Sequence, residues 1–276
     1  NCIILWADHN LSSGLRYYLQ KITSNGQCIW TSNGVLLSCE PFTFDNLKLI
    51  PDSIGGAHII YTTYHAMHSI YRQKIDSYGN YLFSPDNTVI YTDTLEVRIK
   101  NVVSDNAGGA IVAVSKYKNS ENQAITHLFH LSPEGYITGN NPLVPVCGLP
   151  SPNYDIIQGV DNQIILWEIF PNLNNYYTAF RKIDSAGNLL SPQPSIYQLP
   201  SYYADAYCPV AIQDGGLLFA WRVWDPMTHN YSAKMQKFNN NLVPVWQEEG
   251  VLVTTSNPVE ASAQMLMKYD GSILIS

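Results

Sequence analysis

Residues 47–80, with the sequence LKLIPDSIGGAHIIYTTYHAMHSIYRQKIDSYGN, decide the fold. They contain three extended runs, two tight turns and one looser loop, and copies of the stretch recur to the end of the sequence. The first turn has the form Asp-x-x-Gly-Gly and recurs at a spacing of 53 or 56 residues. In the later copies the turn is shorter or its glycines are replaced. Its copies begin at Asp52, Asp105, Asp161, Asp214 and Asp270.

A second marker, Lys-Ile-Asp-Ser-x-Gly, keeps the same period. It stands at 74–79, is well matched at 21–26 and 182–187, and is loosely matched at 130–135 and 237–242. Two independent markers with one period indicate a repeat architecture. Both turns are so tight that the runs on either side must be antiparallel hairpins, and we expect their glycines to supply the positive φ that such turns require.

Each repeat reads as four strands. In the second copy these are 46–51, 57–64, 69–76 and 81–91, and the third of them shows the period of two that marks a strand. Because no stretch looks helical, four-stranded antiparallel units of about 53 residues predict an all-β fold, a β-propeller of four-stranded blades. A parallel β-helix is the alternative, and it would need shorter coils and no tight hairpins.

Five units and a partial sixth form one expected domain, 1–276. The first unit lacks its first strand and the last breaks off after its second, so the 21 expected strands exceed five complete blades by one. The chain is either a five-blade ring with a surplus strand or an excerpt of a longer propeller, and we favour the excerpt because Asn1 falls inside an expected strand. The units are approximately 1–43, 44–94, 95–152, 153–203, 204–256 and 257–276.

Large apolar residues recur at one place of the second strands, where radially packed sheets need a plug between blades. We expect an alanine at position 167 to cost about 3–5 kcal/mol, as a cavity-forming change. The plug residues are Trp6, Tyr61, Val114, Trp167 and Trp221.

Composition excludes several classes of function. With 15 basic and 22 acidic residues the net charge is −7, and no basic stripe is present, so nucleic acid and anionic membranes are not expected as partners. No apolar run approaches the roughly 18 residues of a membrane-spanning helix, so we expect no membrane insertion. The five cysteines include no Cys-x-x-Cys pair, and we expect small buried side chains, with a disulfide among Cys2, Cys28 and Cys39 left open.

Several of these motifs resemble a known kind of repeat. These motifs are similar to the propeller repeats of large secreted proteins of Bacteroidota-type bacteria. The residues that carry the resemblance are Tyr17-Tyr18-Leu19-Gln20-Lys21-Ile22, Trp30 and Asn33-Gly34-Val35, with Trp246 and Gly250-Val251. The resemblance covers nearly the whole chain and implies a propeller at the cell surface or outside the cell. Such proteins are often cargo of type IX secretion, and the export route of this chain stays open. It implies little about activity.

The order of strands predicts where a ligand binds. Both tight turns lie on one face of the propeller, and the longer, variable loops lie on the other, where binding residues concentrate on a rigid scaffold. An aromatic and polar mixture there suits a glycan or a protein partner. The candidate ligand-binding residues are Trp224, Tyr202, Tyr203, His229 and His65.

The alternative is a carbohydrate-active enzyme. A propeller glycoside hydrolase needs two carboxylates about 5–9.5 Å apart. The candidates are Asp8, Glu168 and Asp225, each of which follows the plug tryptophan of its unit within four residues. The sequence offers no Gly-x-Ser-x-Gly elbow and no phosphate loop, and His65-x-x-His68 lacks a third metal ligand. We therefore expect no metal, no cofactor and no catalysis, and a secreted or cell-surface module that binds or has a structural role.

Overall fold

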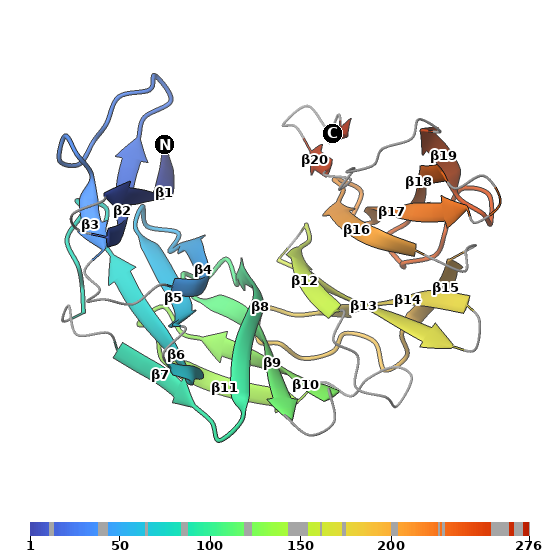
Figure 1. The fold of residues 1–276 in the computed structure, drawn as a ribbon, viewed down its shortest axis with the longest axis horizontal. Helices are drawn as coiled ribbons and strands as arrows, with labels where there is room; N and C mark the ends of the chain where they lie inside the picture. Colours follow the sequence, from blue (N-terminus) through green and yellow to red (C-terminus); the bar gives the residue numbers. More distant parts are fainter. Residues whose placement is uncertain are drawn as a thin grey trace. The chain divides into compact units, whose positions relative to one another are not determined.

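The computed structural model describes most of the chain. The described residues are 1–10, 14–37, 44–63, 66–83, 88–118, 123–142, 154–160, 162–172, 175–199, 204–225, 227, 230–254, 265–267 and 273–275. Every regular element in them is a strand (Figure 1). Accordingly, none of these residues belongs to a helix that could cross a membrane.

The strands form antiparallel sheets in chain order, as expected for propeller blades. The first sheet has three strands, β1 (Cys2–Asn10), β2 (Gly14–Ile22) and β3 (Val35–Leu37). The second has four, β4 (Phe44–Pro51), β5 (Ala57–Thr63), β6 (Ala66–Ile75) and β7 (Thr88–Thr92). The third contains β8 (Glu96–Ser104), β9 (Ala110–Lys118), β10 (Gln123–Leu131) and β11 (Ile137–Pro142).

The remaining sheets repeat this pattern. The fourth contains β12 (Tyr154–Gln158), β13 (Ile164–Asn172), β14 (Asn175–Ile183) and β15 (Ser195–Leu199). The fifth contains β16 (Ala204–Ala211), β17 (Leu217–Asp225), β18 (Asn230–Phe238) and β19 (Val251–Thr254). A two-stranded sheet of β20 (Met265–Met267) and β21 (Ile273–Ile275) follows. The predicted all-β propeller fold and its repeat are confirmed.

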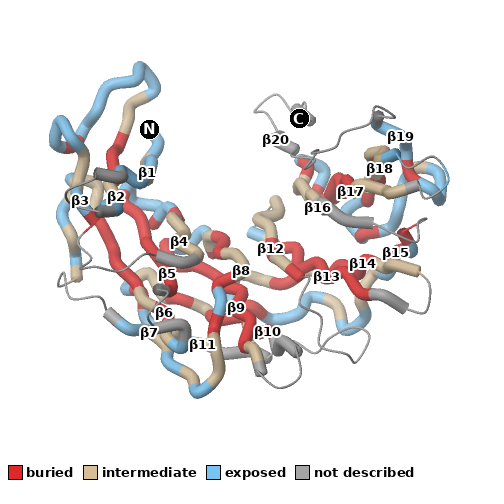
Figure 2. Tube along the Cα trace, in the orientation of Figure 1, coloured by how far each residue is buried: buried red, intermediate tan, exposed pale blue. Residues whose placement is uncertain are grey.

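The chain divides into two compact units, Asn1–Leu143 and Val144–Ser276. The first unit holds the first three sheets, with one apolar cluster between the first and second sheets and another between the second and third. The second unit holds the other sheets, with its cluster between the fourth and fifth. Buried residues lie on both middle and edge strands of each unit, and β5, β9 and β13 are buried along most of their length (Figure 2).

The aspartate turns fold as the sequence predicts, through side-chain bonds to the backbone. Oδ1 of Asp52 accepts hydrogen bonds from the amides of Ile54 (3.1 Å) and Gly56 (2.7 Å), and Oδ1 of Asp105 accepts them in the same way from its own turn. Only the first glycine of the pair has a positive φ, as Gly55 does at 96°. The expectation that both glycines serve positive φ was therefore wrong. The second, Gly56, is needed because a Cβ there would lie 2.2 Å from the carbonyl oxygen of Ile75.

In the first, second and fourth sheets, the lysine of the second marker bonds to the next sheet along the chain. Nζ of Lys21 donates to the carbonyl oxygen of Gly55 at 2.8 Å, in the first turn of the second sheet. Nζ of Lys74 donates to the carbonyl oxygen of Pro133 in the third sheet, also at 2.8 Å, and Nζ of Lys182 donates to that of Gly215 in the fifth at 3.1 Å. The lysine recurs because it satisfies carbonyl groups at the boundary between consecutive sheets.

One plug assignment was wrong. Cross-strand pairing shows which residues of different sheets are equivalent. Ala57, Ile164 and Leu217 are equivalent because each pairs with the last residue of the third strand of its own sheet. Counted from there, the plug place is held by Trp6, Tyr61, Val114 and Trp221, but by Glu168 rather than Trp167 in the fourth sheet. Successive side chains of a strand point to opposite faces, so Trp167 lies on the other face of β13. There it packs edge-on against Phe219, with ring centroids 5.9 Å apart.

The cysteines differ in part from the expectation. Cys2 and Cys28 are free and exposed, and Cys208 is half-buried. The prediction of buried side chains was therefore wrong for two of these three. Cys39 and Cys147 lie outside the described residues.

Candidate functional site

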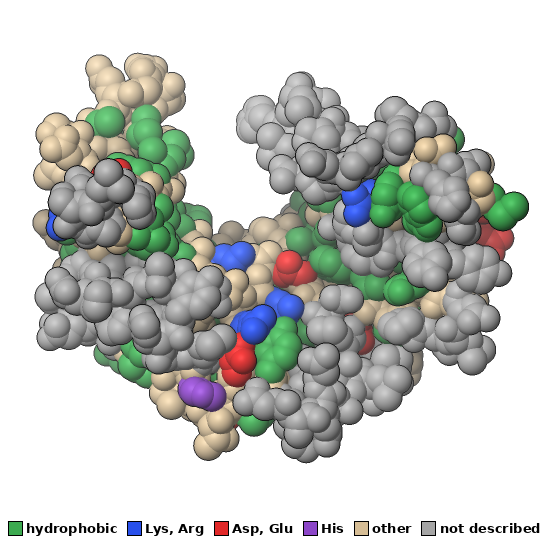
Figure 3. All heavy atoms as spheres, in the orientation of Figure 1, with side chains coloured by type: hydrophobic (Ala, Val, Ile, Leu, Met, Phe, Trp, Pro, Cys, Tyr) green, Lys and Arg blue, Asp and Glu red, His purple; other side chains and the backbone are tan. Residues whose placement is uncertain are grey.

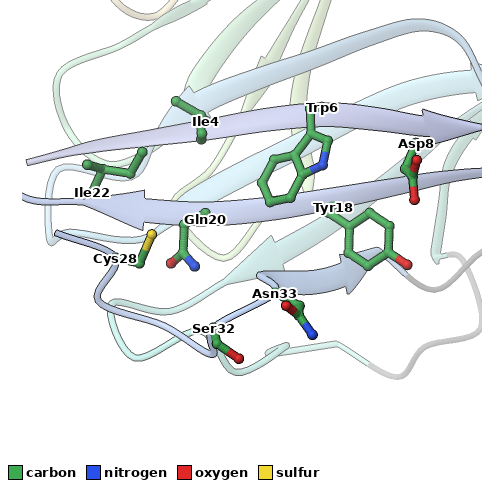
Figure 4. Close-up of a pocket in the computed structure, with 9 residues that line it drawn as sticks. All are labelled: Ile4, Trp6, Asp8, Tyr18, Gln20, Ile22, Cys28, Ser32 and Asn33. Atoms are coloured by element: carbon green, nitrogen blue, oxygen red, sulfur yellow. The ribbon is translucent and has the colours of Figure 1, made fainter. Parts of the chain in front are cut away.

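A pocket with mixed aromatic and polar walls opens on one face of the first sheet. Its volume is about 580 Å³. Residues 4, 6 and 8 of β1 and 18, 20 and 22 of β2 point to the same side because side chains alternate along a strand. The connection from β2 to β3 closes one end. The lining residues are Ile4, Trp6, Asp8, Tyr18, Gln20, Ile22, Cys28, Ser32 and Asn33 (Figure 4).

An aromatic pair forms the floor of this pocket. Trp6 and Tyr18 are directly opposite in the β1–β2 ladder, and their rings stack with centroids 5.7 Å apart and planes 20° apart. Gly34 allows this packing, since a Cβ at that position would lie 2.6 Å from the edge of the Trp6 indole. Neither ring is fully buried, so the pair presents an apolar platform to solvent.

The polar groups around the platform divide into two kinds. Gln20 is buried and structural: its Oε1 accepts bonds from the amides of Lys21 and Trp30, and its Nε2 donates to the carbonyl oxygen of Thr31. Asp8, Ser32 and Asn33 are exposed. Figure 4 shows Asp8 on the same side of the sheet as the Tyr18 ring, beyond the end of the platform. One carboxylate and one amide are thus placed beside two aromatic rings.

The same place in other sheets is covered. Trp221, the counterpart of Trp6, is fully buried and packs edge-on against Tyr197 of the neighbouring sheet at 6.0 Å. Tyr61 is also buried, 1% exposed. The counterpart of Phe219 on β1 is Ile4, which is 42% exposed. The first sheet therefore shows to solvent a surface that the repeat elsewhere buries.

The three candidate carboxylates do not occupy one place in the repeat. Asp8 lies two residues beyond the plug place, Glu168 lies at it, and Asp225 lies four residues beyond it, at the end of β17. Glu168 and Asp225 therefore differ by four residues in their place along the strand, an offset of about 13 Å. Glu168 is buried on β13, while the side chain of Asp225 lies outside the described residues. Of the three, Asp8 is the one that lines a described pocket.

The candidate ligand-binding residues are mostly not described. Tyr202, Tyr203, His229 and His65 lie outside the described residues, so their role stays a prediction. Trp224 is half-buried on β17, and its ring is tilted against Tyr231 at a centroid distance of 4.7 Å.

A charged cluster in the first unit was not predicted from the sequence. Nζ of Lys116 lies 2.9 Å from Oδ2 of Asp93, and the Tyr91 hydroxyl donates to the same oxygen. Burial opposes ionisation of Asp93, but the bonds from Tyr91 and Lys116 outweigh it and hold the pKa of this carboxyl well below its usual range. Lys116 is on β9 of the third sheet and Tyr91 on β7 of the second, so the cluster joins neighbouring sheets. Lys116 is more than 20 residues from its partners in the sequence, so no short motif indicates this cluster.

No trio of metal-binding side chains gathers within the described ranges. On the face in Figure 3, charged side chains of both signs are scattered among apolar ones in the part of the chain that is coloured. No family model and no curated protein matches the chain.

Solved structures do match. They include the neuraminidase-like protein of subtype N10 from A/little yellow-shouldered bat/Guatemala/060/2010 (13% identity, 74% of this chain, TM-score 0.42). Others are a GH43 β-1,3-galactosidase (13%, 93%, 0.44) and an endo-arabinase from Bacteroides thetaiotaomicron VPI-5482 (11%, 83%, 0.45). The chain spans 57% and 60% of the first two, less than two thirds of their length, and 87% of the third.

These findings correct the expected function. The prediction of a binding or structural module without catalysis was wrong on this comparison, because the matching structures are mainly glycoside hydrolases, and we do not retain it. The resemblance to repeats of secreted Bacteroidota-type proteins holds for the propeller blades. Its bacterial group and its export route stay predictions.

Proposed function

We propose that the chain is a carbohydrate-active propeller whose saccharide site is the pocket of Trp6, Tyr18 and Asp8. The observation that carries the proposal is the open stack of Trp6 on Tyr18 with a carboxylate and an amide at its border. A sugar ring has an apolar face that stacks on aromatic rings and hydroxyl groups that need hydrogen-bond partners. This pocket offers both within about 580 Å³.

The roles of the residues follow from their chemistry. The Trp6–Tyr18 platform would hold one sugar ring, and Asn33 and Ser32 would orient its hydroxyl groups. Asp8 would act on the glycosidic bond as an acid or base, because a carboxylate is the group that glycoside hydrolysis requires. A second carboxylate of the usual pair would have to come from residues that the pocket lining does not include.

Saccharide binding and turnover test the proposal separately. The protein is presented with a glycan array and a panel of aryl glycosides and polysaccharides, and reducing-sugar release is followed. Trp6→Ala should weaken binding at least about tenfold because it removes the platform. Asp8→Asn should leave binding nearly unchanged and lower turnover about 100-fold or more.

Trp224→Ala serves as the matched control, since Trp224 is a half-buried tryptophan of the second unit and one of the ligand-binding candidates from the sequence. If Trp224→Ala abolishes binding while Trp6→Ala does not, the saccharide site lies on the fifth sheet and this assignment is refuted. Absence of any saccharide binding would refute the function itself.

The location outside the cell belongs to the same proposal. Polymeric saccharides are too large to enter a bacterial cell intact, so an enzyme for them would work at the surface or beyond it. Fractionation of a host that expresses the natural gene would decide: recovery in the cytoplasmic fraction alone would contradict it.

A further inference from the structure

One cross-strand pair beside the aromatic platform carries opposite charges. In the β1–β2 ladder Trp6 lies opposite Tyr18, and the next pair on the same face of the sheet is Asp8 with Arg16. Side chains two residues apart on a strand point to the same side and are about 7 Å apart. Arg16 therefore stands one step beyond the platform, across the ladder from the carboxylate that lines the pocket.

The propeller repeat does not require a charged pair at this place, which is two residues beyond the plug place. The fourth sheet pairs Phe170 with Tyr177 there. The fifth sheet pairs Val223 with Ser232. Both uncharged pairs belong to regular antiparallel ladders, so the charges in the first sheet are an addition to the scaffold. Departures from a repeated scaffold pattern are expected where residues serve function rather than the fold.

The two charges do not neutralise each other within the protein. Asp8 and Arg16 are both exposed, and within the described ranges neither forms an ion pair or a side-chain hydrogen bond. Arg98, an exposed arginine of β8, does form one, with its Nε 2.6 Å from Oε1 of Glu96. An exposed ion pair contributes little to stability, so the fold loses little when Asp8 and Arg16 stay apart. The N–H donors of the guanidinium and the oxygens of the carboxylate are thus left for a ligand.

We propose that Arg16 is a further substrate-binding residue of this pocket, and that the pocket takes a neutral saccharide rather than an acidic one. The inference rests on the proposed function, in which a sugar ring stacks on the platform and Asp8 acts at the glycosidic bond. Arg16 donates to the hydroxyl group next to that bond, because its side chain starts directly across the ladder from Asp8.

Charge favours the neutral sugar. A hydroxyl group both donates and accepts, so it can bond to the guanidinium of Arg16 and to the carboxylate of Asp8. A sugar carboxylate would gain a bond to Arg16 but would face the like charge of Asp8. Among the described residues that line the pocket none is basic, and Ser32 and Asn33 offer neutral partners that suit further hydroxyl groups.

Methyl glycosides with and without a carboxylate test the proposal on the whole chain. Binding of methyl β-galactoside and methyl β-glucoside, and of the corresponding galacturonide and glucuronide, is measured by NMR titration beside the glycan array. The neutral glycoside should bind about tenfold tighter than its uronide. Arg16→Met should weaken the neutral glycoside about tenfold, because a hydrogen bond from a charged donor is lost. Arg16→Lys keeps the charge without the planar fork and should recover part of that loss.

A second variant separates charge from shape. In Asp8→Asn the uronide should approach the affinity of the neutral glycoside, because the like charge is removed. Arg98→Met is the matched control, an exposed arginine of the third sheet, and should change neither ligand. Binding of acidic glycans alone, a uronide that binds as tightly as its neutral counterpart, or equal losses with Arg16→Met and Arg98→Met would each overturn this inference and leave the proposed function standing. Absence of any saccharide binding would remove both.

Discussion

At the scale of single residues, two glycines of one turn serve different needs. Gly108 has a φ of 94°, which an L-residue rarely adopts, whereas Gly109 is required by space. A Cβ on Gly109 would lie 2.1 Å from the carbonyl oxygen of Leu131, inside the ladder of the third sheet. Because that oxygen belongs to backbone held on both sides, it cannot move aside cheaply.

We therefore predict that Gly109→Ala lowers the free energy of unfolding by about 2–3 kcal/mol. Gly26→Ala is the matched control: Gly26 has a φ of 79° but nothing within 4 Å of its missing Cβ, so only backbone strain of about 1 kcal/mol is expected. Urea unfolding followed by tryptophan fluorescence measures both. Equal losses would show that the close approach of Leu131 to Gly109 costs no more than the backbone strain at Gly26, against the prediction.

His58 gives the second prediction at this scale. It is fully buried, and its Nε2–H donates to the carbonyl oxygen of Gly108 at 2.8 Å. Burial, reinforced by the positive charges of Lys74 and Arg72, holds the pKa of His58 below its ordinary value of 6.5. The unfolded chain then binds a proton that the folded chain resists, so stability is full above about pH 6.5 and falls as the pH drops below it.

The free energy of unfolding should consequently decline between about pH 6.5 and 5, and more steeply than in His58→Gln. The glutamine amide can still donate to Gly108 but does not titrate in this range. Urea titrations at several pH values compare the two slopes. Parallel curves for the two proteins would mean that His58 titrates alike in the folded and unfolded states.

At the scale of the strand, the plug place shows how burial depends on the neighbouring sheet. Trp221 and Trp6 occupy the same place, and each has a close glycine, Gly250 and Gly34. Trp221 is fully buried, and Trp6 is not. The same residue type in the same local setting should therefore differ in its contribution to stability.

We predict that Trp221→Ala costs about 3–5 kcal/mol, as a buried cavity-forming change. Trp6→Ala should cost about 1–2 kcal/mol, since less apolar area returns to water. Denaturant unfolding monitored by circular dichroism in the far ultraviolet measures both without relying on tryptophan signal. A cost at Trp6 as large as at Trp221 would mean that its face is covered in solution.

Strand patterns were largely predictable, and the one error has a simple cause. Hairpins, their order and most strand limits follow from glycine turns and period-two alternation, which are local. In the fourth sheet, however, Trp167 was assigned to the plug place because it is the tryptophan of that strand. It lies four residues after Gln163, the last turn residue, whereas Trp221 lies five residues after Gly216. A shift of one residue exchanges the two faces of a strand. Five residues after Gln163 is Glu168, so the spacing from the turn already indicates the place, and the cross-strand pairing with β14 confirms it.

At the scale of the whole molecule, the candidate site was less predictable than the fold. The sequence singled out Trp6 and Asp8 separately, one as a plug and one as an acid. It could not show that Tyr18 stacks on Trp6, because that contact joins two strands, or that the pair stays open, because this depends on a different sheet. Such dependence on distant segments is why the sequence analysis favoured residues expected on loops, such as Trp224, which the structure places on β17.

The division into two units gives the last prediction. Both apolar clusters of Asn1–Leu143 are made entirely of residues from that unit, and the sheet-to-sheet bonds of Lys21 and Lys74 also stay within it. A three-sheet unit with its own core has what independent folding requires. Residues 1–143 expressed alone should therefore unfold cooperatively in urea and show fixed aromatic signals in near-ultraviolet circular dichroism. Lys74→Met in this shorter chain should lower its stability, because the carbonyl oxygen of Pro133 and the carboxylate of Asp52 lose their partner. A broad transition without near-ultraviolet signal, as in a molten globule, would show that the first unit needs the rest of the chain to pack.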